Sequence, residues 1–128
     1  MKRSELLGRV RFVSHGAKKI LRFDFSDLDI EGAREVITYG TRLVAQMPNH
    51  SVLTLTDVTR ANYDKEITEA LKEFTRHNKP HVIAGAVVGV SGLKKVIFQA
   101  VATVSGRSNL RLFDDLETAK DWLVQYGG

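Results

Sequence analysis

The chain has 128 residues, of which 43% are hydrophobic and 27% are charged, and its formal net charge is +4. This length predicts one domain, and the mixture of both charges argues against intrinsic disorder. The absence of cysteine excludes disulfide bonds, thiolate metal ligands and cysteine nucleophiles. No apolar run is long enough for a transmembrane segment or a secretory signal, so we expect neither. We expect a cytoplasmic location.

The positive charge is concentrated at the start of the chain. Residues 1–25 contain seven basic and two acidic residues, so this segment has a net charge of +5 and the rest of the chain has −1. Basic residues protect an edge strand from pairing with other chains, and a basic patch can also bind an anionic partner. Because no aromatic platform or nucleic-acid motif accompanies them, we expect no nucleic acid as a partner.

Two short segments near the start predict a strand–turn–strand unit. Basic and apolar residues alternate over residues 9–13 and again over residues 19–25, which is typical of strands with one wet face. A helix is predicted over residues 30–47, because apolar residues recur there every three or four positions. Either Asp27 or Asp29 is expected to cap this helix.

The middle of the chain predicts a strand, a helix and a second strand. Residues 51–58 form the strand, a polar loop follows over residues 59–63, and a helix extends from about Asp64 to His77. Residues 81–88 are nearly all apolar, which is typical of a strand buried on both faces of a parallel sheet.

A turn at residues 89–92 is expected to lead into a third helix over residues 93–104, with Ser91 as its N-cap. Phe98 and Val101 extend the apolar surface of this helix beyond one stripe, so we expect a protein partner, a second copy, an apolar ligand or a neighbouring helix to cover it. The stripe that faces the sheet is expected to contain Leu93, Val96, Ile97, Ala100 and Val104.

The end of the chain predicts a last strand over residues 110–113 and a helix over residues 116–126, with Asp114 as a capping residue. The complete order is ββαβαβαβα. Strands that alternate with helices predict a single α/β domain, in which a mixed, mostly parallel sheet is covered by helices.

Two motifs suggest binding chemistry without specifying it. Residues 89–95 resemble an anion site, because free backbone N–H groups at a helix start, together with Lys94, attract phosphate or carboxylate. The alternative is an ordinary capped turn, since the spacing matches no phosphate-binding glycine motif.

Asp57 ends a central strand, where ligands bind in open α/β sheets, but the acidic pair and the lysine of a receiver domain are missing. The alternative is an Asp57 carboxylate that accepts backbone N–H groups of the next loop.

The histidines do not predict a metal site. His77 and His81 are four residues apart, but Pro80 lies between them, so we expect no helix to place them on one face. No carboxylate cluster accompanies them. We therefore predict no metal ligand, no catalytic residue and no cofactor.

Several segments together resemble the STAS domain, the fold of the anti-anti-sigma factors and of the cytoplasmic tail of sulfate transporters. They are residues 53–58 (LTLTDV), 74–80, 86–95 (AVVGVSGLKK) and 112–114. The closest resemblance is to a stand-alone bacterial STAS-like family that is often grouped with lipid-binding CRAL-TRIO domains. In anti-anti-sigma factors a kinase phosphorylates a serine at the start of the following helix, whereas this chain has Asp64 near that place.

The resemblance implies a non-enzymatic module that docks a protein partner or forms a homodimer. Its expected contact residues lie in two loops and on the third helix. They are Thr59, Arg60, Asn62, Tyr63, Asp64, Ser91, Gly92, Lys94, Phe98 and Val101. The first alternative is a carrier, in which Ser91, Gly92 and Lys94 bind the anionic head of a small ligand or lipid and the helix binds its apolar tail. The second alternative is an enzyme with a site around Asp57.

Overall fold

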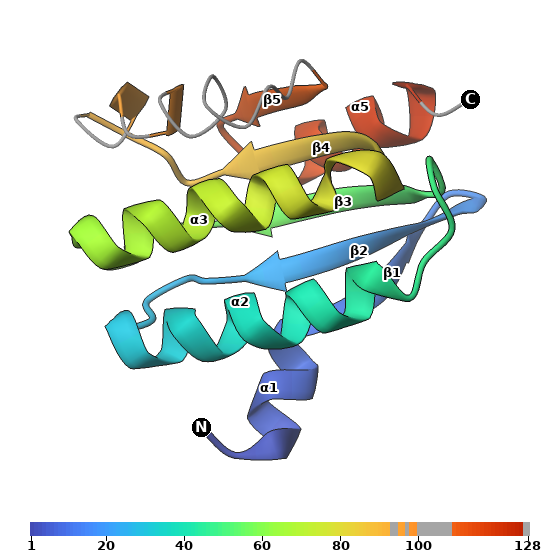
Figure 1. Cartoon of the computed structure of the whole chain (residues 1–128). Coiled ribbons are helices and arrows are strands. Elements are labelled where there is room, and N and C mark those ends of the chain that lie inside the picture. Colours follow the sequence, from blue (N-terminus) through green and yellow to red (C-terminus); the bar gives the residue numbers. More distant parts are fainter. Residues whose placement is uncertain (93–94, 97, 100–108, 127–128) are drawn as a thin grey trace.

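Five strands form one sheet in the computed structural model, which describes residues 1–92, 95–96, 98–99 and 109–126. The strands lie side by side in the order in which they occur along the chain (Figure 1). β1 is antiparallel to β2 and all other neighbours are parallel, so the predicted mixed, mostly parallel sheet is confirmed. The strands are β1 (Val10–His15), β2 (Lys18–Asp24), β3 (Val52–Asp57), β4 (Val82–Val88) and β5 (Leu110–Phe113).

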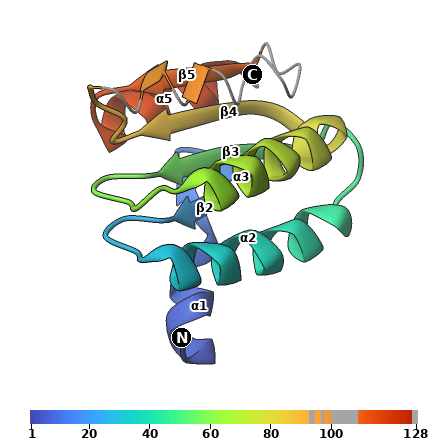
Figure 2. The same cartoon turned by 60° about the vertical axis from the view of Figure 1, so that its left-hand side comes forward.

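Helices lie on both faces of this sheet. α2 (Ile30–Ala45) and α3 (Lys65–Asn78) cover one face, and α5 (Leu116–Tyr126) packs on the other (Figures 1 and 2). A short 3-10 helix, η1 (Lys79–His81), continues α3. None of the described helices combines the length and apolar character that a membrane span requires.

The N-terminal helix α1 (Arg3–Arg9) is not predicted by the sequence patterns. It has only seven residues and buries none of them fully, so it lacks the repeated apolar stripe that reveals an amphipathic helix. Leu6 alone among its residues packs against the core. Most of the predicted helix over residues 93–104 lies outside the described residues.

Aspartate side chains mark where α2, α3 and α5 begin. The Asp29 carboxylate accepts a hydrogen bond from the Gly32 nitrogen at 2.8 Å, which selects Asp29 over Asp27 as the cap of α2. The Asp64 carboxylate accepts from the Ile67 nitrogen at 2.7 Å and caps α3. Asp115, and not the predicted Asp114, accepts from the Thr118 nitrogen before α5. The capping residue therefore lies one position later than predicted there.

The central strand β3 separates the two cores. Leu53 and Leu55 face α5, where they pack with residues such as Leu123. Thr54 and Thr56 face α3. The alternation of leucine and threonine along β3 thus gives one face two leucine side chains and the other face two hydroxyl groups.

Gly40 allows α2 to lie close to the sheet and to α3. A Cβ atom at this position would lie 2.9 Å from the Phe23 ring and 3.1 Å from the Phe74 ring. The two rings themselves meet edge to face, with 5.1 Å between their centroids. A side chain at position 40 would therefore displace the aromatic centre of this core.

Candidate functional site

The loops that follow β2 and β3 leave the sheet at the same edge, because the two strands are parallel (Figure 2). Asp24 and Asp57 are paired in register at the ends of these strands. Oδ1 of Asp57 accepts hydrogen bonds from the backbone nitrogen and the hydroxyl of Thr59, at 3.0 and 2.6 Å. Oδ1 of Asp24 makes the same contacts with Ser26, at 2.9 and 2.5 Å. The expectation that Asp57 accepts backbone N–H groups of the next loop is therefore confirmed.

Arg22 lies between the two carboxylates. Its Nη2 is 3.8 Å from Oδ2 of Asp24 and 3.7 Å from Oδ2 of Asp57. Arg9 reaches the same corner and donates from Nη1 to the backbone oxygens of Asp24 and Ser26, at 3.2 and 2.9 Å. Through these contacts both carboxylates hold the loops that follow their strands. Within the part of the chain that is described, no group of three or more metal-ligating side chains exists.

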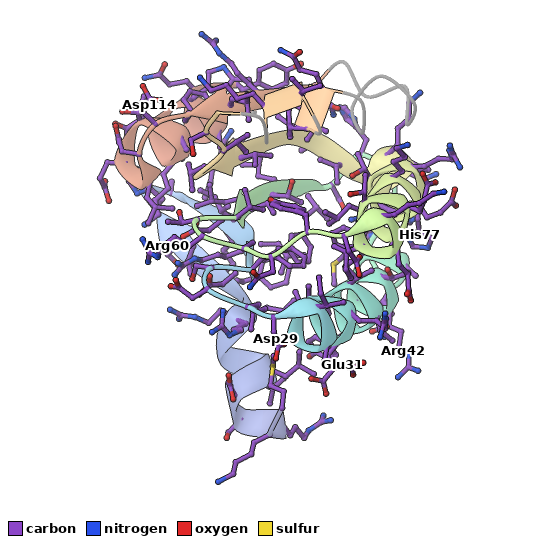
Figure 3. All side chains as sticks on the ribbon, turned by 90° about the vertical axis from the view of Figure 1, so that its left-hand side faces the viewer. Asp29, Glu31, Arg42, Arg60, His77 and Asp114 are labelled. Carbon is purple, nitrogen blue, oxygen red and sulfur yellow. The ribbon has the colours of Figure 1, made fainter. Side chains whose placement is uncertain are left out.

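Arg60 ties the loop after β3 to the loop after β2. Its Nε and Nη2 donate to the two carboxylate oxygens of Asp27, at 2.6 and 2.9 Å. Both residues have left-handed backbone angles, with φ of 53° and 59°. The hydrogen bond from Arg60 lowers the pKa of the Asp27 carboxyl below its ordinary value. In Figure 3, Arg60 and His77 of α3 lie on opposite sides of the molecule.

The predicted contact residues around Arg60 also hold the fold together. The Asn62 side chain donates to the backbone oxygen of Leu28 at 2.8 Å, and Asp64 caps α3. Thr59 bonds to Asp57, as described above. The side chains of Thr59, Arg60, Asn62 and Asp64 therefore make internal contacts, and their role in docking a partner stays a prediction.

The two loops that the sequence predicts as one docking surface do lie together. Gly89 has φ of +89°, and a Cβ atom there would lie 2.5 Å from the Thr59 nitrogen. Only a glycine permits this close approach. Ser91 and Gly92 follow in exposed positions, whereas Lys94 and Val101 lie outside the described residues.

An apolar cavity of about 80 Å³ lies between α3 and the sheet. Its walls come from β2, β3, β4, β5, α3 and the loop before α3, and none of the described residues that line it is charged. The residues that define its shape are Phe23, Thr54, Thr56, Tyr63, Leu71, Phe74, Val87, Val90, Phe98 and Leu110.

The register of the sheet places a residue without a side chain beside Thr54. Thr54 pairs with Gly85 on β4, and Gly85 pairs with Leu110 on β5. Gly85 therefore contributes no side chain to the row that contains Thr54 and Leu110. The next row contains Thr56 and Val87, which line the cavity.

Phe98 and Val96 correct the prediction for the third helix. Phe98, which was expected to extend beyond the stripe that faces the sheet, packs against the core of α2 and α3 and lines the cavity. Val96, which was expected to face the sheet, is 63% exposed. The helical period alone does not fix the rotation of a helix that is apolar over most of its surface.

Tyr63 lies at the cavity wall in the loop before α3. Burial raises the pKa of its phenol to about 12. The side chain is therefore neutral at any physiological pH. It adds to the cavity an aromatic surface and no charge.

The prediction for the histidine pair is wrong in its geometry. The rings of His77 and His81 stack, with 6.2 Å between their centroids. Pro80 does not separate them, because it occupies the first turn of η1, where proline is tolerated, and η1 continues from α3. Nδ1 of His81 lies 2.8 Å from the backbone oxygen of Met47, so His81 also contacts the segment that follows α2.

Thr54 and Thr56 were not predicted as site residues, and neither was Gly85. A signal for the threonines was present, because they alternate with two leucines in a strand that begins with two apolar residues. Gly85 lies beside Thr54 only because β3 and β4 pair in this register, which cannot be derived from one strand alone.

Comparison with protein-family models, with curated proteins and with solved structures finds no match for the chain. The resemblance to STAS-like proteins stays a prediction from the sequence motifs. The cavity and the loops at the strand ends carry the functional proposal instead.

Proposed function

We propose that the chain is a non-enzymatic binding module that holds the aliphatic part of a small ligand in the cavity between α3 and the sheet. The observation that supports this proposal is the cavity itself, which is lined mainly by apolar side chains. Ligand sites in proteins are typically concave and apolar, with a few polar groups that orient the ligand. The proposal develops the carrier alternative that the sequence leaves open.

The volume limits the size of the group that enters. A cavity of about 80 Å³ is roughly half of the ~150 Å³ that admits benzene in an engineered protein core. A short aliphatic group therefore fits better than an aromatic ring. A longer chain would leave its remaining part outside the cavity.

Docking of a protein partner or of a second copy is the other non-enzymatic role that the STAS-like resemblance implies. The loops that were expected to dock a partner lie together, which is compatible with this role. Their side chains are engaged in contacts within the chain, whereas the cavity offers unfilled apolar surface. We therefore favour the small ligand.

Calorimetric titration with straight-chain alcohols from ethanol to octanol tests the proposal. Each methylene that enters the cavity adds about 0.8 kcal/mol of binding free energy, so affinity is expected to rise with chain length and then to level off when the cavity is full. Leu71→Phe places a larger side chain at the cavity wall and is expected to abolish saturable binding. Leu7→Phe makes the same change on exposed α1 and is expected to leave binding intact.

The proposal is wrong if the wild type binds no alcohol saturably. It is also wrong if the Leu71→Phe variant, folded by circular dichroism, gives the same affinities as the wild type.

A further inference from the structure

We infer that the cavity selects a neutral ligand that carries one hydrogen-bonding group, a hydroxyl or a carbonyl, on its short aliphatic part, and that Thr54 and Thr56 bind this group. The inference rests on the proposed function and specifies its ligand class. It begins from the juxtaposition of two hydroxyl groups with an apolar cavity.

The position of the threonines on β3 is unusual for a core. Thr54 is only 5% exposed, and it faces a cavity whose other walls include Phe23, Leu71 and Val87. Valine has nearly the same shape and would be favoured at such a place, because burial of a hydroxyl without a partner costs about 1–3 kcal/mol. A hydrogen-bonding partner in the cavity would offset this cost.

Two other polar side chains of the wall already make contacts within the chain. The Thr75 hydroxyl donates to the Leu71 backbone oxygen at 2.8 Å, within its own helix. Oδ1 of Asn78 lies 3.2 Å from Nδ1 of His77. By contrast, the hydroxyls of Thr54 and Thr56 make no hydrogen bond to another residue among those that the structure describes. The two β3 threonines are therefore available to a ligand, as is Nδ2 of Asn78, which donates to no other residue among those described.

The charge of the site defines the ligand further. No described residue of the wall is charged, and burial of an ion without a partner is far more costly than burial of a neutral polar group. Among the described residues of the wall, none would pair with a carboxylate or an ammonium, so we expect a neutral ligand. Hydroxyl and carbonyl groups suit two threonine hydroxyls, each of which both donates and accepts.

Water is the competing occupant. The cavity has room for ordered water, and a water molecule there would bond to the same hydroxyls. In that case the threonines would bind solvent and would not discriminate between ligands. The experiment must therefore compare two ligands of equal shape, one with and one without the polar group.

NMR titration with n-butanol and n-pentane makes this comparison, because the two molecules differ by a hydroxyl in place of a methyl group. We measure the ratio of the two dissociation constants in the wild type, in Thr54→Val and in Thr56→Val. Loss of one hydrogen bond is expected to shift the ratio toward pentane by about five- to tenfold. Thr75→Val is the matched control, because its hydroxyl already donates within α3, and it is expected to leave the ratio unchanged.

Thr54→Ser keeps the hydroxyl and is expected to retain the wild-type ratio, which separates hydrogen bonding from packing. If both ligands bind but the ratio is the same in the wild type and in both β3 valine variants, the inference is wrong and the proposed function stands. If neither ligand binds the wild type, the proposed function fails and the inference fails with it.

Discussion

At the scale of single residues, Tyr63 reports directly on the environment of the cavity. Its phenol is partly buried at the wall, and burial raises its pKa from the ordinary value of 10.0 to about 12. A folded-state pKa above the unfolded one means that the neutral phenol stabilises the fold below about pH 10. This contribution is lost as the pH rises from about 10 toward 12.

We expect the ultraviolet titration of the wild type to contain a step near pH 12 that Tyr63→Phe removes. The wild type is also expected to lose more stability than the variant between about pH 10 and pH 12, as measured by urea unfolding. The account of the cavity wall is contradicted if the variant loses a step near pH 10 instead.

The residues at the strand ends illustrate what a single sequence can establish. The position of Asp57 at the end of a strand predicts that it accepts backbone N–H groups of the next loop, and the contact with Thr59 confirms it. The equivalent contact of Asp24 with Ser26, and Arg22 between the two aspartates, depend on the pairing of β2 with β3. No pattern within either segment contains that pairing.

At the scale of elements, Gly40 shows how one glycine sets the distance between α2 and the core. Gly40→Ala gains about 1 kcal/mol of helix propensity, but its Cβ would press on Phe23 and Phe74, and such overpacking costs about 1–3 kcal/mol. We expect a net loss of stability in urea unfolding. Gly8→Ala on α1 meets nothing within 4 Å and is expected to gain about 0.5–1 kcal/mol. A Gly40→Ala variant as stable as the wild type would show that α2 can move away from the core at no cost.

Hydrophobic periodicity predicts the strands and the three longest described helices, because each buries a regular stripe or alternation. It fails for α1, where only Leu6 packs against the core. It also reverses Phe98 and Val96, since a helix with apolar residues on most of its surface gives no unique rotation. The rotation is decided by the tertiary contacts of Phe98, which a single sequence does not contain.

At the scale of the whole molecule, the sheet produces both candidate sites in different ways. Parallel strands end at one edge, so the meeting of the loops around Thr59 and Gly89 could be predicted from the order of elements. The cavity could not, because its walls combine side chains from four strands and from α3, such as Phe23, Thr54 and Leu110. Its function therefore follows from tertiary structure and not from a motif.

The most direct test of this account is whether a small apolar guest enters the cavity. Xenon binds dry apolar cavities without needing a polar partner, so methyl NMR of the protein under xenon pressure locates the site. We predict shifts of the methyl groups of Leu71, Val87 and Val90, and none for Leu55 and Leu123 in the core under α5. Unchanged methyl signals at Leu71, Val87 and Val90, or shifts confined to the α5 core, would contradict the account.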